Sequence, residues 1–194
     1  MKSSLLASAV VAAMFGLAPL LAQAGVPQPQ DRSDNVPPPQ DTPYPGTMTV
    51  HVDATDTSHR IFSVHETIPA KAGPMYLLYP AWIPGDHEPS GPIRKVASLM
   101  VSANGKKLTW TRDKYNVFAF LVDVPAGASS IDVDFQFLSS QKKDEGSIRM
   151  TPEMLDLSWS KVSIYPAGYY GSQIQVVPSV TLPAGWQFGT ALEV

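Results

Sequence analysis

The dipeptide His65-Glu66 is the first candidate for chemistry, because it matches the start of a zinc-hydrolase helix. Such a helix needs His-Glu-x-x-His, in which imidazoles four residues apart lie on one face and share a zinc ion. The fourth residue after His65 is Pro69, which cannot ligate a metal. The neighbouring residues also alternate between apolar and polar types, which predicts a strand that sends adjacent side chains to opposite faces. We therefore expect no zinc site at this dipeptide.

A second candidate lies in YPAWIPGDHEPSGPI, residues 79–93, where an apolar run changes into prolines, glycines and ionisable side chains. Carboxylates and an imidazole in one loop would suit zinc or a hard divalent cation. The other histidines are scattered along the chain, so no second cluster completes a ligand set. The simpler interpretation is a turn with an exposed polar tip, since Pro-Gly is good turn chemistry. The candidate residues of this corner are Trp82, Pro84, Gly85, Asp86, His87 and Glu88.

Nucleophilic catalysis has little support in the sequence. The chain has no cysteine and no Gly-x-Ser-x-Gly, and nothing indicates a base beside Ser90. A glycosidase-like pair of carboxylates remains open, although no two acidic residues are singled out. Tyr165, Tyr169 and Tyr170 form an aromatic group that would suit a sugar or a protein interface. Core positions are the alternative for these tyrosines.

The net charge argues against nucleic-acid binding, and the amino-terminal residues indicate export. The 194 residues carry a formal net charge of -3, which leaves no basic surface for phosphates. Lys2, the uncharged apolar residues 5–21 and the small-residue site Ala22-Gln23-Ala24 predict a signal peptide over residues 1–24. A glycine and a proline interrupt the apolar run, which favours a signal peptide over a membrane anchor. We expect a periplasmic or secreted chain with no stable membrane span after cleavage.

Residues 25–46 are expected to form a flexible leader, because they contain seven prolines and almost no apolar side chains. From residue 47 to residue 194 the hydrophobic period is two, as IDVDFQF at residues 131–137 shows most clearly. Asn104-Gly105 predicts a tight hairpin. The fold class is therefore all-β, a two-sheet antiparallel sandwich in one domain, with Trp82 holding the corner against it. Further strands are expected at residues 48–54, 60–68, 75–79, 116–124, 155–165, 174–182 and 186–192.

Four segments of this domain carry a family resemblance: LLYPAWIPGDHEPSGPI, NGKKLTWTRDKYNVFAFLVDVPAG, MTPEMLDLSWSKVSIYPAGYY and VTLPAGWQFGTAL. In this order they resemble the amino-terminal domain of the glycyl aminopeptidase family, metallopeptidase family sixty-one, over residues 47–194. The corner departs from the family's commoner Trp-Thr-Pro-Gly-Ser-Tyr, with Ile83 for Thr and Asp86-His87 for Ser-Tyr. If this corner touches substrate in relatives, the departure bears on substrate choice here.

The resemblance implies a protein of three parts: a β-rich amino-terminal domain, a thermolysin-like catalytic domain that binds zinc, and a PDZ-like domain. Only the first resembles this chain, and no zinc ligand or catalytic glutamate of the family carries over to it. The expected function is a non-catalytic domain that docks on a metallopeptidase domain in cis and shapes access to it, with zinc only in that catalytic domain. The alternatives are a stand-alone secreted module that binds a glycan or peptide and, more remotely, a small metalloenzyme centred on His87.

Overall fold

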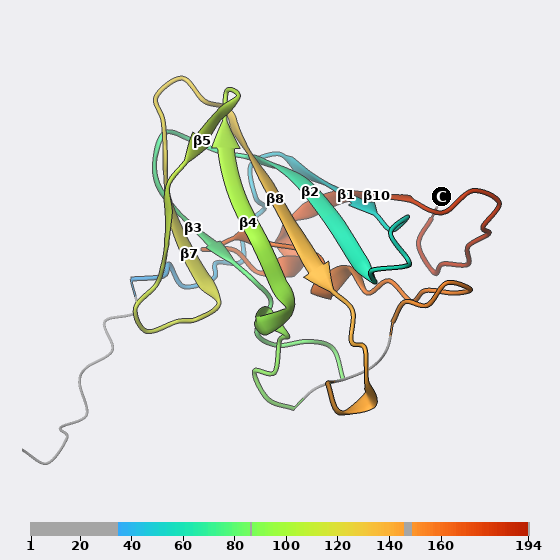
Figure 1. Ribbon diagram of the computed structural model, residues 1–194. Coiled ribbons are helices and arrows are strands. Elements are labelled where there is room, and N and C mark those ends of the chain that lie inside the picture. The colour runs from blue at the N-terminus through green and yellow to red at the C-terminus, as the bar shows by residue number, and fades with distance from the viewer. Residues whose placement is uncertain (1–34, 86, 146–148, 194) are drawn as a thin grey trace, which may run out of the picture. The chain divides into compact units, whose positions relative to one another are not determined.

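The computed structural model describes residues 35–85, 87–145 and 149–193, and the statements below concern these residues. The predicted signal peptide and the first ten residues of the leader lie outside them. The strands form a six-stranded sheet in the order β10-β1-β2-β8-β4-β5 and a four-stranded sheet in the order β6-β7-β3-β9 (Figure 1). In the described part of the chain, no helix is long and apolar enough to cross a membrane. The predicted two-sheet sandwich is confirmed.

The described residues form ten strands and four short 3-10 helices. The strands are β1 (Thr47–Asp53), β2 (Ile61–Pro69), β3 (Gly73–Leu78), β4 (Val96–Ala103), β5 (Lys106–Leu108), β6 (Trp110–Arg112), β7 (Ala119–Val124), β8 (Ser130–Leu138), β9 (Tyr165–Pro166) and β10 (Gln175–Thr181). Four short 3-10 helices connect them: η1 (Ile93–Lys95), η2 (Lys143–Glu145), η3 (Trp159–Lys161) and η4 (Gly171–Gln173).

β8 shows how the alternating sequence forms the core. Ile131, Val133, Phe135 and Phe137 are all buried, whereas the polar residues between them are partly exposed. β8 pairs along its nine residues with β2, whose side chains at positions 62, 64, 66 and 68 are likewise buried. The two strands lie in the middle of the six-stranded sheet, so the core is built on their inner faces.

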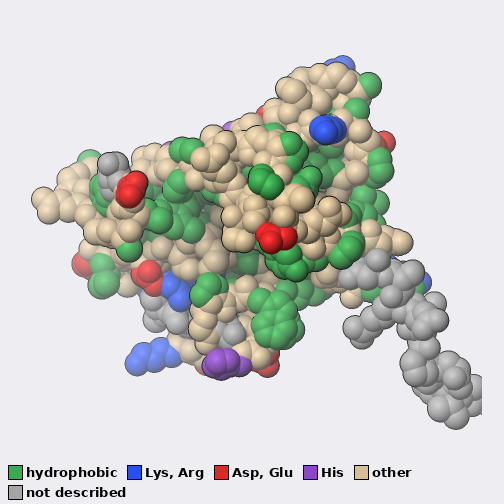
Figure 2. All heavy atoms as spheres, turned by 180° about the vertical axis from the view of Figure 1, so that it is seen from behind, with side chains coloured by type: hydrophobic (Ala, Val, Ile, Leu, Met, Phe, Trp, Pro, Cys, Tyr) green, Lys and Arg blue, Asp and Glu red, His purple; other side chains and the backbone are tan. Residues whose placement is uncertain are grey.

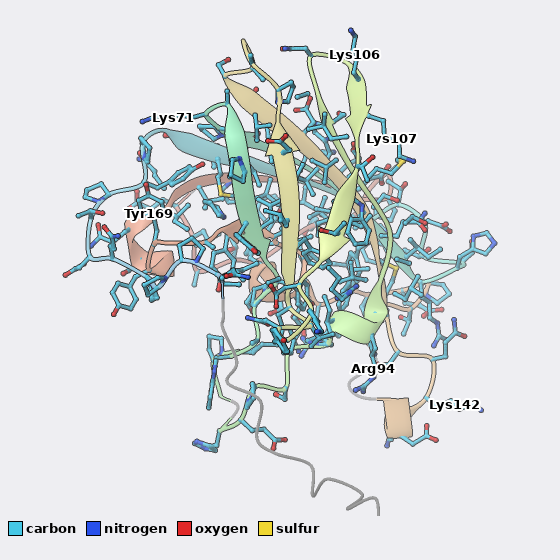
Figure 3. The ribbon with its side chains drawn as sticks, turned by 90° about the vertical axis from the view of Figure 1, so that its left-hand side faces the viewer. Lys71, Arg94, Lys106, Lys107, Lys142 and Tyr169 are labelled. Atoms are coloured by element: carbon cyan, nitrogen blue, oxygen red, sulfur yellow. The ribbon has the colours of Figure 1, made fainter. Side chains whose placement is uncertain are left out.

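The predicted hairpin at Asn104-Gly105 is confirmed. Ala103 pairs with Lys106, and the two residues between them have φ values of 50° and 71°, the left-handed conformations that such a turn requires. β5, which follows the turn, is an edge strand that carries Lys106 and Lys107, and both side chains extend away from the sheet in Figure 3. Lysines at an edge oppose pairing with another chain.

Two of the expected strands do not form. Residues 155–165 contain η3 and end in β9, because their backbone makes tight-turn bonds such as Lys161 N–H to Ser158 O at 2.9 Å. Residues 186–192 form no strand, and a turn bond from Trp186 N–H to Pro183 O precedes them. The six-stranded sheet has one parallel pair, β1 with β10, whereas the other paired strands of the described chain run antiparallel.

The described part of the leader is attached to the domain, which differs from the flexible segment that its composition predicts. Gln40 N–H donates to Gly168 O at 3.0 Å, and Tyr44 N–H donates to Gln173 O at 2.8 Å. The Tyr44 ring packs edge-on against Tyr169 with the ring centroids 4.9 Å apart. A single aromatic residue thus supplies the apolar contact that the proline-rich composition lacks.

Truncation of Ile131 to alanine tests the assignment of the β8 face. Ile131 is fully buried, so Ile131→Ala should lower the free energy of unfolding by about 2–5 kcal/mol. Leu138→Ala at the exposed end of the same strand is the matched control and should cost less than about 1 kcal/mol. Urea unfolding followed by circular dichroism measures both, and equal losses would contradict the assignment.

Candidate functional site

β2 places His65 and Glu66 on opposite faces, as the alternation predicts. His65 is exposed, and its Nδ1 lies 2.8 Å from Asp134 Oδ1 on the outer face of the sheet. Glu66 is fully buried on the inner face. The two side chains therefore cannot share an ion. Nowhere in the described residues do three His, Asp or Glu side chains lie where they could hold a metal together.

The predicted corner is a loop whose ends are joined. Gly91 N–H donates to Ala81 O at 2.8 Å and closes the loop at its base. Pro84 and Gly85 are exposed, and Gly85 has a φ of 93°, which suits a turn at this point. The remaining tip residues, His87 and Glu88, are exposed as well, whereas Asp86 lies outside the described residues.

Trp82 does not hold the corner against the sandwich, so that prediction is wrong. Its side chain is 64% exposed, whereas the next residue, Ile83, is buried. Tyr79 fills the inward position at the start of the loop, and its hydroxyl donates to Lys161 O at 2.8 Å. With Tyr79 and Ile83 filling the inward positions, Trp82 remains exposed.

An apolar groove, the β10 groove, lies along the inner face of β10. Val176 and Pro178 pair with Met48 and Val50 of β1 and so face the core side of the sheet. Met48 and Val50 are buried, but Val176 is 41% exposed. The six-stranded sheet thus extends one strand beyond the side chains that cover it. The main apolar residues of the groove are Trp82, Trp159, Tyr165, Val176, Pro178 and Leu192.

A second hollow adjoins the β10 groove at Trp159, which lines both, but its lining is mixed and includes the carboxylates of Glu153 and Asp156. Exposed Met154 and Phe188 line it together with Val180, the next inward residue of β10. Figure 2, seen from behind, shows patches of hydrophobic side chains among backbone and other atoms, with a few charged side chains between them. Exposed apolar surface such as that of the β10 groove is typical of a docking site.

The free edge of β10 is unsuited to adding another strand. Ala54 N–H donates to Thr181 O at 2.9 Å, so the peptide groups of Thr181 and of alternate residues before it face β1. The peptide groups of Val176, Pro178 and Val180 therefore face outward, and Pro178 has no N–H to donate. A partner at this place would bind through side chains in the groove rather than by extending the sheet.

The three candidate tyrosines are divided between two surfaces. Tyr165 lines the β10 groove, whereas Tyr169 packs on Tyr44 in a separate groove that also includes Lys71. Figure 3 shows Tyr169 and Lys71 on the same side of the domain. Tyr170 is 50% exposed. They therefore do not form one aromatic interface.

Glu66 is a feature that sequence reasoning missed. Its Oε1 accepts a hydrogen bond from Ile164 N–H at 2.8 Å, and its Oε2 has no hydrogen-bond partner among the described residues. Burial raises the pKa of this carboxyl well above its usual range, while the Ile164 N–H lowers it to a lesser extent. The sequence did indicate a buried carboxyl, because Glu66 takes an inward position of β2 between the apolar residues Val64 and Ile68.

Comparisons with known proteins agree with the β fold. A family model, the Peptidase M61 N-terminal domain, matches residues 49–194. Among solved structures, the chain is similar to an aminopeptidase N family protein from Idiomarina loihiensis, with a TM-score of 0.55 and 14% sequence identity. This match covers 71% of the present chain and 22% of the other, so the chain spans less than a quarter of that protein. No curated protein sequence matches the chain.

The close approach at Gly91 gives a test of the corner. A Cβ at this position would lie 1.9 Å from Pro80 O, so Gly91→Ala should displace the base of the loop and cost about 1–3 kcal/mol of stability. Gly171→Ala is the matched control, because a Cβ there meets no atom within 4 Å. Thermal unfolding measures the difference, and an unchanged midpoint for Gly91→Ala would refute this account of the corner.

Proposed function

Because the chain belongs to the family of peptidase M61 N-terminal domains, we propose that it is the non-catalytic β domain of a metallopeptidase-like protein, which docks on the catalytic domain and shapes access to it. The observation that carries the proposal is the apolar β10 groove, together with the exposed hydrophobic side chains of the adjoining hollow. Of the ten large hydrophobic side chains that are exposed among the described residues, five line the groove or the hollow: Trp82, Met154, Val176, Phe188 and Leu192.

The proposed occupant of the β10 groove is the catalytic domain in cis. The match covers 22% of the structurally similar aminopeptidase N family protein, so that protein carries much additional sequence beyond the part that resembles this chain. The groove is lined by uncharged side chains except for Glu193. A predominantly apolar partner surface suits such a lining, since a buried unpaired charge would be costly.

The corner would lie at the border of this interface. Trp82 lines the β10 groove, while His87 and Glu88 are exposed on the same loop. If the catalytic domain packs on Trp82, the polar tip of the loop lies next to the surface of the catalytic domain. We assign the tip to the rim of the substrate cleft in the complete protein, where its charge would affect which peptides enter.

Zinc belongs to the catalytic domain in this proposal. The described residues of the present chain do not fit a zinc site, since His65 and Glu66 face opposite sides of β2 and no three ligating side chains converge. The remaining parts of the proposal, export and a periplasmic or secreted location, depend on the charge and apolar pattern of residues 1–24.

Aspartate substitutions on the two faces of β10 test the docking surface. Val176→Asp places a charge in the groove and should weaken binding to a separately expressed M61 peptidase domain by about tenfold or more. Val177→Asp is the matched control, because Val177 pairs with Thr49 on the outer face of the same strand. Isothermal titration calorimetry measures both affinities, and the unfolding midpoints show whether both variants fold.

Two results would contradict the docking role. One is an equal loss of affinity in both variants, and the other is the absence of binding by the unmodified chain. If the chain is monodisperse, does not bind the peptidase domain and binds a glycan or an extended peptide, the stand-alone module is supported instead.

The chain alone is predicted to have no peptidase activity. Purified chain incubated with zinc and glycyl or alanyl anilides should release the aniline at the background rate, because no described group of side chains can hold a catalytic ion. Release above that of a buffer control, abolished by a chelator, would show that the chain is itself an enzyme.

A further inference from the structure

Residues 159–166 form one wall of the β10 groove, and we call this segment the strap. Few of its residues pair with a neighbouring strand. It supplies Trp159, Ser160, Ser163 and Tyr165 to the groove. Its ladder to β3 contains only two residue pairs, Leu77 with Pro166 and Leu78 with Tyr165. The position of the groove wall therefore depends on the few other bonds that the strap makes with the sandwich.

One of these bonds comes from Glu66. The strap buries Val162 and Ile164 in the core, and the Ile164 N–H donates to Glu66 Oε1 at 2.8 Å. This bond joins the strap to the middle of β2, where Glu66 pairs with Val50 and Val133. The second carboxyl oxygen, Oε2, is buried without a hydrogen-bond partner in the described structure. A neutral carboxyl tolerates this place far better than a carboxylate, because a buried anion needs compensating partners.

We propose that Glu66 is a proton-dependent latch, which holds the strap and thus the wall of the β10 groove in place while it is protonated and releases them when it ionises. The inference rests on the proposed docking function for its biological meaning. The structural part, the latch itself, stands on the contacts of Glu66 and can be tested without any partner.

Glu66 is the group whose ionisation controls the latch, because the described groups around it are apolar, neutral or on the other face of the sheet. Its neighbours across β1 and β8 are valines, and His65 and Asp134 lie on the other face of the sheet. Tyr79 and Tyr165 belong to elements packed nearby, and burial raises the pKa of both phenols above the ordinary value, so neither is charged at neutral pH. The cation of the strap is Lys161, whose carbonyl accepts the Tyr79 hydroxyl.

The sign of the pH dependence follows from linkage. When the strap opens, Glu66 reaches water and regains its ordinary pKa, whereas burial raises the pKa in the closed state. The closed state is therefore fully stable below the ordinary pKa and loses stability as pH rises toward the raised one. Over that interval the population of the open state should increase about tenfold per pH unit.

Hydrogen exchange of the Ile164 amide measures the opening directly in the intact chain. After correction for the intrinsic rate, protection of Ile164 should fall about tenfold per pH unit in the unmodified protein. It should also be lower than the protection of the β8 amides, because the strap opens without unfolding of the central sheet. Glu66→Gln keeps the acceptor oxygen and cannot ionise, so its Ile164 protection should not vary with pH. Glu66→Leu removes the acceptor and should leave Ile164 poorly protected at every pH.

Three results would overturn the latch. They are a pH-independent Ile164 protection in the unmodified chain, the same pH dependence in Glu66→Gln, and Ile164 protection equal to that of the β8 amides, which would mean that only global unfolding exposes the strap. If Glu66→Gln does not fold, carbon-13 titration of the Glu66 carboxyl in the unmodified chain decides the matter. An ordinary pKa in that titration would refute the latch.

Affinity for the M61 peptidase domain, measured at pH 6 and pH 9, separates the latch from the docking function. The unmodified chain should bind more weakly at the higher pH, and Glu66→Gln should not. A pH-dependent Ile164 exchange without any binding would refute only the proposed docking. Binding that Val176→Asp abolishes, together with pH-independent exchange, would refute only the latch.

Discussion

β2 and β8 pair along nine residues in the middle of the six-stranded sheet, and the other elements are placed relative to this ladder. Its register determines which residues face inward, because a shift by one position would move every core side chain to the solvent. β1 and β4 add to its two sides, and the four-stranded sheet covers the shared core. The same register puts Glu66 inside and His65 outside, so the chemistry available to each residue follows from the pairing.

The four-stranded sheet is narrower than the six-stranded one, and the difference explains the apolar surface. β10 adds a strand beyond the region that the smaller sheet covers, so Val176 faces the core side without being buried. The strap, which includes η3, covers part of the gap and contributes Trp159 to it. Pro178 removes an outward N–H from the exposed edge. The molecule thus limits strand addition at a place where it leaves apolar side chains accessible.

The sequence was a good guide wherever alternation and turn chemistry act locally. β8 and the Asn104-Gly105 hairpin follow from period-two patterning and from the need for positive φ. The patterning failed at residues 155–165, where apolar residues also alternate but the backbone turns, and at Trp82, where Ile83 takes the inward place. The β10 groove could not be foreseen, because it depends on the relative widths of two sheets. Glu66 could have been found from its inward position alone.

The pairing of the first strand with the last has a consequence for the newly made chain. Thr47 and Gln175, which face each other in β1 and β10, are separated by 128 positions in the sequence. One side of β1 therefore stays open during synthesis until nearly the entire domain has left the ribosome. Contacts of such long range slow folding and prolong the time in which an exposed strand can meet other unfolded polypeptides. Only the edge of β1 that faces β10 must wait for the end of the domain, because its other edge pairs with β2.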